Sequence, residues 1–525
     1  MEHRETDTVL AQSALIAALM KPAAYSHPVS SIELFETHIS WVILTGSFAY
    51  KIKKAVQMDF LDFGTLERRL HFCQEELRLN RRWAPDLYLA VVPICGSIDH
   101  PSVGGEGEAI EYAVKMPQFS QGAQLDNQVI AGLLHEQDVH DLAETIAGYH
   151  GRAKIIEYAN DRESVGKVRA PMLDNFAPLK QTIDMDLLGR IQQWTADSLR
   201  DLKPTLIQRR KDGFVRECHG DLHLANLVRL SEGIVAFDCV EFSAELRNID
   251  VMSDIAFLVM DLVARARQDL GYVCLNRYLE CTGDYSGLDV FSLYFVYHCM
   301  IRAKVAAIRS TERTKGEDKE QDIAEVKHNL AVAARWIEAP RRWLIAMHGY
   351  SGSGKTWVSS LLLSQLPAIR VRSDIERKRL LGLDETANSD SKPGAGIYTD
   401  HARGDVYAKL VEIAEGLLEA GFNVIIDASF LRQADRKLPA ALAGRQGVFF
   451  AFVSTSADEA ELLRRLQERE KSGKDASEAD ADVLQYQFRN SEPFNAAERK
   501  KTVFVGTEKK VDAGRIIKSL KKKVR

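Results

Sequence analysis

The segment GYSGSGKT at residues 349–356 limits the possible folds of this chain more than any other feature. It follows the apolar run WLIAM and precedes another apolar stretch, so a loop between a strand and a helix is expected. Glycines let backbone amides converge on phosphate groups, and the helix start adds partial positive charge. Lys355 can then reach the β and γ phosphates, and Thr356 can hold Mg²⁺. The pattern predicts a phosphate-binding loop (P-loop, Walker A) with nucleotide contacts from Gly349, Gly352, Ser353 and Gly354.

The region around this loop alternates between strand and helix patterns. Apolar runs favour strands at residues 343–347, 369–372, 423–426 and 447–453. Helical spacing is expected from residue 355 onward and over residues 406–420 and 457–471. Alternation of this kind predicts an α/β domain whose parallel sheet is covered on both faces.

Charged side chains follow the predicted strands. Asp374 comes after the second strand and Asp427 ends the third, where ligands of parallel sheets gather. We expect Asp374 to bind the acceptor or act as a base and Asp427 to ligate the metal, with helix capping as the alternative. Arg464, Arg465 and Arg469 lie on a helix leading into SGKDASEADAD, which is typical of a mobile lid. Arg469 is the predicted nucleotide contact, and a solvated helix face is the alternative.

A second polar pattern lies upstream, in CHGDLHLANLVRLSEGIVAFDCVEF at residues 218–242. Its spacing is that of a kinase catalytic loop. Asp221, with His219 beside it, is predicted to be catalytic by accepting the proton of a hydroxyl acceptor, and Asn226 and Asp238 are predicted metal ligands. A polar turn in which His219 and Asn226 cap backbone groups is the alternative.

A strand at residues 48–51, FAYK, resembles the kinase motif that carries a phosphate-binding lysine. The strand period of two puts Lys51 and Lys53 on one face, so Lys51 is the predicted phosphate contact and Lys53 the reserve. A helix over residues 71–83 supplies Glu75 and Glu76 as possible ion-pair partners, with Glu76 preferred and an exposed helix face as the alternative.

With these motifs, residues 30–330 resemble the aminoglycoside phosphotransferase family, which are small-molecule relatives of protein kinases. The stretches ETHISWVILTGSFAYKIKKAV and LDFGTLERRLHFCQEELRLNRR also resemble a bacterial two-domain group that joins such a domain to an ATP-binding domain. Two departures are Cys239-Val240 in place of a Phe-Gly pair, and a loop at Gly46 that is not a full GxGxxG. Asp254 matches the position of an aspartate that often braces the catalytic loop in this fold.

Residues 342–506 resemble P-loop kinases of the gluconate-kinase-like, polynucleotide-kinase-like and zeta-toxin-like groups. The resemblance is carried by GYSGSGKT, SDIERKRL and VIIDASFL. It implies an acceptor-binding segment near Gly394–Tyr398. The expected fold is therefore an α+β protein-kinase-like bilobal domain followed by an α/β P-loop kinase domain with a parallel sheet.

Length and charge agree with two domains acting on small molecules. The 525 residues suggest about two to four domains, and Pro340 is the expected boundary between residues 1–338 and 339–525. A net charge of -5 gives no general attraction to nucleic acid. The basic tail from Lys509 could meet RNA, but no aromatic platform accompanies it, so a solvated terminal helix is preferred and nucleic acid is not the expected partner of the second domain. No CxxC pair, export signal or apolar stretch of about 20 residues is visible, so we expect a cytoplasmic protein without a membrane partner.

The sequence thus predicts a bifunctional ATP-dependent phosphotransferase with two separate Mg²⁺-ATP sites and small hydroxyl acceptors. The alternatives are a nucleotide-dependent regulator or sensor ATPase, and a toxin-like kinase of a nucleotide sugar or an RNA end. The sequence names neither acceptor, because such kinases select acceptors through loops with little motif content.

Overall fold

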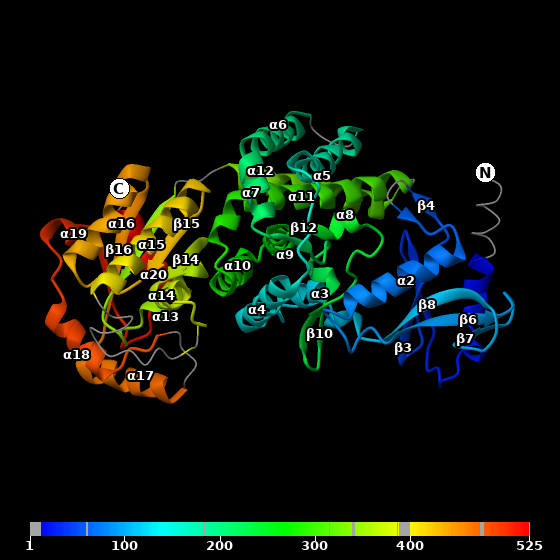
Figure 1. Ribbon diagram of the computed structural model, residues 1–525, viewed down its shortest axis with the longest axis horizontal. Helices are drawn as coiled ribbons and strands as arrows, with labels where there is room; N and C mark the ends of the chain where they lie inside the picture. The colour runs from blue at the N-terminus through cyan, green and yellow to red at the C-terminus, as the bar shows by residue number, and fades with distance from the viewer. Residues whose placement is uncertain are drawn as a thin grey trace. The chain divides into compact units, whose positions relative to one another are not determined.

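The computed structural model describes residues 12–523 except 59–60, 182–184, 314–315, 339–341, 386, 388–399 and 473–476 (Figure 1). The chain forms two compact units. Unit 1 comprises Met1–Asp138, Arg152–Asn160 and Arg209–Asp261, and unit 2 comprises Val139–Gly151, Asp161–Gln208 and Leu262–Arg525. The expected boundary at Pro340 lies outside the described residues, and unit 2 takes in residues on both sides of it. The division into residues 1–338 and 339–525 stays a prediction.

Unit 1 contains a six-stranded antiparallel sheet in the order β1-β2-β3-β8-β6-β7, blue in Figure 1. Its strands are β1 (Glu33–Glu36), β2 (Ser40–Leu44), β3 (Phe48–Lys53), β6 (Ala90–Gly96), β7 (Pro101–Val103) and β8 (Ala109–Pro117). The β-rich run at residues 41–53 is thus two strands joined by a tight turn. Gly46 lies in that turn with φ +90°, and a Cβ there would lie 1.9 Å from Ser30 Oγ, so only glycine fits.

Helix α2 (Leu66–Asn80) packs against β6 and β8 of this sheet. Thr65 caps its start by accepting a hydrogen bond from the backbone N–H of Arg68. Ala49 of β3 packs with Cys73 of the helix, whereas Tyr50 and Ile52 pack with a cluster on the other face. Strand alternation therefore turns every second residue of β3, from Ala49 onward, toward α2.

The rest of unit 1 carries the predicted catalytic loop between two short antiparallel pairs. Strand β9 (Val215–Glu217) pairs with β12 (Asn248–Asp250), and β10 (Leu227–Leu230) pairs with β11 (Gly233–Ala236). Smaller elements are β4 (Gln57–Met58), β5 (Leu61–Asp62), η1 (Pro22–Ala24), η2 (Gln121–Ala123), α3 (Leu125–Ile130), η4 (Leu224–Asn226) and α8 (Ala244–Arg247). The loop at residues 218–226 and Asp238 are both held at the ends of these strands.

Three helices contain residues of both units: α4 (Glu136–Arg152), α7 (Lys203–Lys211) and α9 (Val251–Ala264). The helical part of unit 2 contains α5 (Asp161–Asp174), η3 (Ala177–Gln181), α6 (Met185–Asp201), α10 (Gln268–Thr282), η5 (Tyr285–Gly287), α11 (Leu288–Glu312) and α12 (Glu317–Ile337). Phe295 of α11 stacks on Trp336 of α12 with ring centroids 3.8 Å apart. Among the described residues, one helical stretch, Tyr285–Thr311, is long and apolar enough to span a membrane, yet 61% of its apolar window is buried, as in the core helix of a soluble protein.

Unit 2 also contains a five-stranded parallel sheet in the order β14-β15-β13-β16-β17. The strands are β13 (Trp343–His348), β14 (Ala368–Arg372), β15 (Asn423–Asp427), β16 (Phe449–Ser456) and β17 (Thr502–Gly506). The helices are α13 (Lys355–Leu363), α14 (Ser373–Leu380), α15 (Asp400–Glu419), α16 (Gln433–Gln446), α17 (Glu459–Ser472), α18 (Ala481–Asn490), α19 (Ala496–Lys500) and α20 (Ala513–Lys523). The predicted α/β class with a parallel sheet is confirmed.

The predicted elements of this sheet are close to the observed ones. Helix α15 begins at Asp400, six residues before the expected start at Val406. The basic tail forms helix α20, whose Ile516 and Leu520 are buried in the cluster around β13 and α13. The tail is therefore an amphipathic helix that covers the sheet.

Candidate functional sites

The loop at residues 218–226 in unit 1 brings the predicted catalytic and metal-binding side chains together. Asn226 Nδ2 donates to Asp221 Oδ2 at 2.9 Å and to the Asp221 carbonyl at 3.0 Å. The amide oxygen of Asn226 is thus the atom available to a metal ion. Asp221 is 40% exposed at its side chain, so it is accessible to a substrate.

His219 is completely buried, which differs from the catalytic contact predicted for it. Its Nε2 lies 3.0 Å from the Phe237 carbonyl oxygen. Burial lowers the pKa of His219 despite the nearby carboxylates, which favours the neutral ring. A buried neutral imidazole bonded to the Phe237 carbonyl positions the segment before Asp238.

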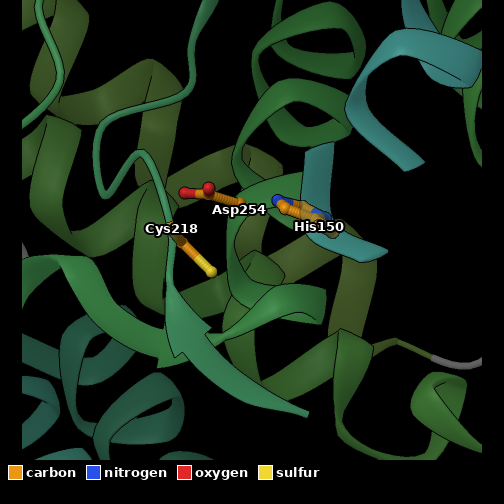
Figure 2. Close-up of side chains that lie close together, drawn as sticks. All are labelled: His150, Cys218 and Asp254. Carbon is orange, nitrogen blue, oxygen red and sulfur yellow. The ribbon is translucent and has the colours of Figure 1, made fainter. Parts of the chain in front are cut away.

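Asp254, near the start of α9, binds the backbone of the same loop. Its Oδ2 accepts from the His219 N–H at 2.7 Å, and its Oδ1 accepts from the Gly220 N–H at 2.9 Å. Figure 2 shows this carboxylate pointing toward the loop that follows Cys218. Gly220 has φ +85°, and a Cβ there would lie 2.6 Å from the Leu246 carbonyl oxygen. The loop is therefore fixed by a carboxylate and by a position that only glycine fits.

Lys51 of β3 lies where the motif predicts it. Its Nζ is 2.8 Å from Glu76 Oε1 of α2 and also pairs with Asp238. Burial would lower the pKa of Lys51, but Asp238, Glu76 and Glu241 hold it well above its ordinary value. Glu75, the other candidate partner, instead bonds Arg78 on the helix surface. The structure thus joins the lysine, the preferred glutamate and the predicted metal aspartate in one ion-pair cluster.

A second buried pair, Lys53 and Glu241, extends this cluster; Lys53 is the reserve lysine of the sequence analysis, whereas Glu241 was not singled out there. Lys53 Nζ is 2.7 Å from Glu76 Oε2 and pairs with Glu241. Burial raises the pKa of Glu241 even though Lys53 opposes it, whereas at Glu76 burial is outweighed by Lys51 and Lys53, which lower its pKa. The strand period pointed to Lys53, but no short motif marks Glu241, three residues after Asp238.

The unusual Cys239 fits tightly beside Asp238. Its N–H donates to Asn80 Oδ1 at 2.8 Å, and its thiol donates to the His219 carbonyl at 3.2 Å. The Asp238 N–H donates to the Tyr88 hydroxyl at 3.0 Å. Asp238 itself has φ +63°, an uncommon conformation for a residue other than glycine. Hydrogen bonds from three separate parts of the chain therefore fix Asp238 and Cys239. Cys239 and Val240 stand where the kinase motif has a Phe-Gly pair.

The phosphate-binding loop in unit 2 has the backbone that its glycines predict. Gly349, Gly352 and Gly354 have φ of +145°, +80° and +84°. A Cβ on Gly352 would lie 2.8 Å from the Leu462 carbonyl oxygen. The buried Ser353 hydroxyl lies 2.7 Å from Thr455 Oγ1 of β16, which ties the loop to the sheet.

The expected magnesium donors lie beside this loop. Asp427 at the end of β15 is 4% exposed and accepts a hydrogen bond from Ser359 Oγ at 3.1 Å. Ser359 also donates to the carbonyl of Thr356 at 2.9 Å. A carboxylate and a hydroxyl are hard oxygen donors of the type that Mg²⁺ prefers. The residues present therefore fit a magnesium ion, which supplies positive charge beside the phosphates when bound.

Asp374 begins helix α14 at the end of β14. Arg377 NH1 donates to its Oδ1 at 2.8 Å. Burial would raise the pKa of Asp374, but Arg377, Lys355, Arg372 and Arg469 together hold it below its usual value. The carboxylate is thus ionised at neutral pH and able to accept a proton.

The three lid arginines on α17 differ in what they contact. Arg464 is exposed and pairs with glutamates of its own helix. Arg465 donates to the Gly352 carbonyl at 3.2 Å and to Thr507 at 2.9 Å, so it supports the phosphate-binding loop. Arg469 lines the same cavity as Lys355 and Asp374. Arg465 lines this cavity as well, so two of the three arginines face it, and Arg469 stays the predicted nucleotide contact.

This cavity has a volume of about 310 Å³ and contains Lys355, Thr356, Asp374 and Asp427. Its wall also includes side chains that no motif marked: Arg403, Tyr407, Arg432 and Asp435. They come from α15 and from the start of α16, where helical spacing showed elements but not their orientation. The acceptor segment expected near Gly394–Tyr398 lies outside the described residues.

Comparisons with known proteins match both parts of the chain. A family model described as an AAA domain matches residues 344–494. The uncharacterized proteins Rv2004c of Mycobacterium tuberculosis and Mb2027c of Mycobacterium bovis are each 30% identical over 427 residues, which cover 79% of this chain and 83% of theirs. Because 427 residues exceed the length of either predicted domain, each alignment includes residues of both.

Solved structures of two kinds are also similar. The APS kinase of Mycobacterium tuberculosis, in complex with AMPPNP and APS, shares 18% identity over 35% of this chain and 99% of its own, with a TM-score of 0.26. Choline kinase from Cryptosporidium parvum Iowa II shares 10% identity over 59% of this chain and 90% of its own, with a TM-score of 0.38.

Proposed function

The chain belongs to the family of the mycobacterial protein Rv2004c, and we propose that it is a bifunctional ATP-dependent phosphotransferase with two separate Mg²⁺-ATP sites. Because the relatives are uncharacterized, support comes from the side chains of this chain. The observation that carries the proposal is the cavity in unit 2, which gathers Lys355, Thr356, Asp374 and Asp427. These four groups cover the tasks of phosphoryl transfer: phosphate binding, metal binding and proton acceptance.

In unit 2, Lys355 and the loop amides bind the β and γ phosphates, and Thr356 and Asp427 hold the metal. The acceptor hydroxyl oxygen attacks the γ phosphorus as the bond to the β-γ bridging oxygen breaks. The hydroxyl proton passes to the Asp374 carboxylate, which is ionised at neutral pH. ADP leaves with the electrons of the broken bond.

In unit 1, Lys51 contacts the phosphates and Glu76 orients it. Asp221 is the accessible carboxylate that takes the acceptor proton, and Asn226 and Asp238 hold the metal. His219 and Asp254 position the loop through backbone hydrogen bonds and do not touch substrate. Free ATP would displace the direct pair between Lys51 and Asp238, because both groups bind its phosphates or metal.

The charge of the second cavity favours an acceptor that carries an anionic group. Among the described residues, the wall has seven cationic side chains and three carboxylates. The cations Lys355, Arg465 and Arg469 belong to the P-loop and α17. The remaining cations come from β14, α14, α15 and the residue before α16, which are the acceptor side of the sheet: Arg372, Arg377, Arg403 and Arg432. The excess of cations over carboxylates makes the wall net positive, which favours an anionic acceptor over a neutral polyol.

The test is a transfer assay on the full-length protein with ATP labelled at the γ phosphate. Acceptors are supplied in matched pairs that differ by one anionic group, such as glucose with gluconate and glucosamine with glucosamine 6-phosphate. Lys355→Ala and Asp221→Asn variants assign each product to its site. We expect the Lys355-dependent products to come from the anionic member of a pair. Turnover with water as the sole acceptor would instead support a regulatory ATPase.

A further inference from the structure

Among the described strands, β14 forms one edge of the parallel sheet, and a side chain of helix α10 binds its outer backbone groups. Asn276 Nδ2 donates to the Ala368 carbonyl at 2.9 Å, and its Oδ1 accepts from the Arg370 N–H at 2.6 Å. Edge strands ordinarily leave such groups for water or for another strand. The Asn276 side chain is 3% exposed, so its amide replaces a neighbouring strand at this point.

One helical turn later, Glu280 extends from the same face of α10. Its Oε1 accepts from Arg370 NH2 at 2.8 Å and from Arg370 Nε at 3.2 Å. Glu280 is 3% exposed, and burial alone would raise its pKa, but Arg370, Arg372 and Arg277 together lower it. This buried carboxylate is therefore ionised and matched to the guanidinium group of Arg370.

The other side of the Arg370 guanidinium reaches the first turns of α13, directly after the phosphate-binding loop. Its NH1 donates to Ser360 Oγ at 2.7 Å, to Ser359 Oγ at 3.3 Å and to the Thr356 carbonyl at 3.5 Å. Ser359 Oγ in turn donates to Asp427 Oδ2. The chain of contacts from Glu280 therefore ends at both proposed magnesium donors.

We propose that Glu280 and Arg370 are positioning residues of the second site, so that helix α10 contributes to the geometry of that site. The inference rests on the proposed function of the P-loop. Neither residue lines the cavity, so they act through Ser359 and Thr356. In a Glu280→Gln variant, the buried guanidinium of Arg370 would lose its carboxylate partner. Its positive charge would then lie uncompensated near Thr356 and Asp427, the proposed magnesium donors. We therefore expect a lower affinity for Mg²⁺ and little change in the affinity for ATP without Mg²⁺.

The experiment measures Mg²⁺ affinity by calorimetry in full-length protein saturated with ATP. An Asp238→Asn background removes the metal aspartate of the first site. Glu280→Gln is expected to raise the Mg²⁺ dissociation constant of the Lys355-dependent site by about tenfold, the scale of supporting contacts around metal ligands. Glu280→Asp, which keeps the charge, should recover part of the loss. Hydrogen exchange of the first turn of α13, without ligands, should quicken in Glu280→Gln.

The matched control is Glu325→Gln on α12. Glu325 is a carboxylate of the helical part of unit 2 that also pairs with two arginines, Arg302 and Arg309. We expect it to leave Mg²⁺ affinity unchanged. If Glu280→Gln lowers the melting temperature as Glu325→Gln does but keeps wild-type Mg²⁺ affinity, the positioning role is wrong.

Two further results separate this inference from the proposed function. If the parent protein shows no nucleotide binding that depends on Lys355, the phosphotransferase proposal for unit 2 fails and this inference fails with it. If Glu280→Gln does not fold, Arg370→Lys tests the inference instead. It keeps the positive charge but loses the guanidinium contacts to both α10 and α13. Wild-type Mg²⁺ affinity in a folded Arg370→Lys variant would also overturn the inference.

Discussion

At the level of single residues, Asp221 and Asp238 of the first site are both accessible carboxylates, but their surroundings differ. Asp221 is bonded by the Asn226 amide, whereas Asp238 pairs with Lys51 and is held by the Tyr88 hydroxyl. A base acts on the attacking hydroxyl, whereas a metal ligand acts in the bound state before chemistry. The two carboxylates should therefore respond differently to removal of their charge.

We predict that Asp221→Asn lowers phosphoryl transfer at the first site by about 10²–10⁴-fold and leaves Mg²⁺-ATP affinity nearly unchanged. Asp238→Asn should weaken Mg²⁺-ATP binding as well. Single-turnover transfer and calorimetry, both in a Lys355→Ala background, measure the two quantities. Equal loss of nucleotide affinity in both variants would contradict the division of roles.

His348, at the end of β13, predicts a pH dependence of stability. Burial, Arg436 and Lys355 lower its pKa to about 3, while Glu498 opposes this shift. The unfolded chain binds a proton near pH 6.5, and the folded chain does not until about pH 3, so stability falls as pH decreases between these values. The slope should approach about 1.4 kcal/mol per pH unit. Urea unfolding at pH 7, 6 and 5 measures it, and a His348→Gln variant with the same slope would refute the assignment.

At the level of elements, the P-loop depends on backbone conformations that side chains rarely adopt. The loop turns sharply between β13 and α13, with Gly352 against the Leu462 carbonyl of α17. Such a turn is not favoured by any residue except glycine. The cost of a substitution there is local strain that moves the phosphate-binding amides.

We predict that Gly352→Ala abolishes nucleotide binding at the second site, because its Cβ would lie 2.8 Å from a backbone oxygen at φ +80°. Gly404→Ala in helix α15 is the control, since among the described residues no atom outside the helix's own backbone lies within 4 Å of its added Cβ. That control should gain roughly 0.5–1 kcal/mol of stability. Calorimetric nucleotide binding and thermal unfolding check both, and binding by Gly352→Ala with wild-type affinity would disprove the strain argument.

The contact between α10 and the edge of the sheet gives a second prediction for elements. Asn276→Ala would leave the Ala368 carbonyl and the Arg370 N–H unbonded, which costs about 2 kcal/mol or more. Asn329→Ala on α12 is the matched control, because Asn276 and Asn329 both donate to the carbonyl four residues earlier. We expect faster hydrogen exchange at Arg370 in Asn276→Ala alone. Equal protection in both variants would show that the edge is held by other contacts.

At the scale of the whole molecule, the two proposed sites use separate sets of residues. No described side chain of the first site is among those that line the cavity of the second. Separate sites bind nucleotide independently unless a conformational change links them. The number of nucleotides bound by the whole chain should therefore be the sum of one for each site.

We predict that the full-length protein binds two Mg²⁺-ATP molecules, and that Lys355→Ala and Asp238→Asn each reduce the number to one. The double variant should bind none, because each substitution removes a group specific to its own site. Calorimetric stoichiometry gives the count. A value of one in the wild-type protein, abolished by either variant, would mean a single composite site.

Several expectations from the sequence depended on local spacing, and these correspond closely to the structure. The strand-loop-helix around Lys355 and the face shared by Lys51 and Lys53 follow from the helix and strand periods. By contrast, His219 occupies a position of the kinase catalytic loop, but its side chain is buried. The motif did not predict this, because burial depends on residues distant in the sequence. Glu241 and Arg432 have no motif because their partners come from other elements.

The sequence by itself determined the strand-loop-helix at Lys355 and the face shared by Lys51 and Lys53, because a glycine loop or a strand period acts over a few neighbouring residues. Only the tertiary structure decided which buried charges meet. Glu280 and Arg370 are 90 positions apart, and their pairing depends on how α10 packs against β14. Burial then makes the pairing obligatory, since an ionised carboxylate removed from water must find a matching cation. Packing of this kind is a property of the folded chain and leaves no local pattern in the sequence.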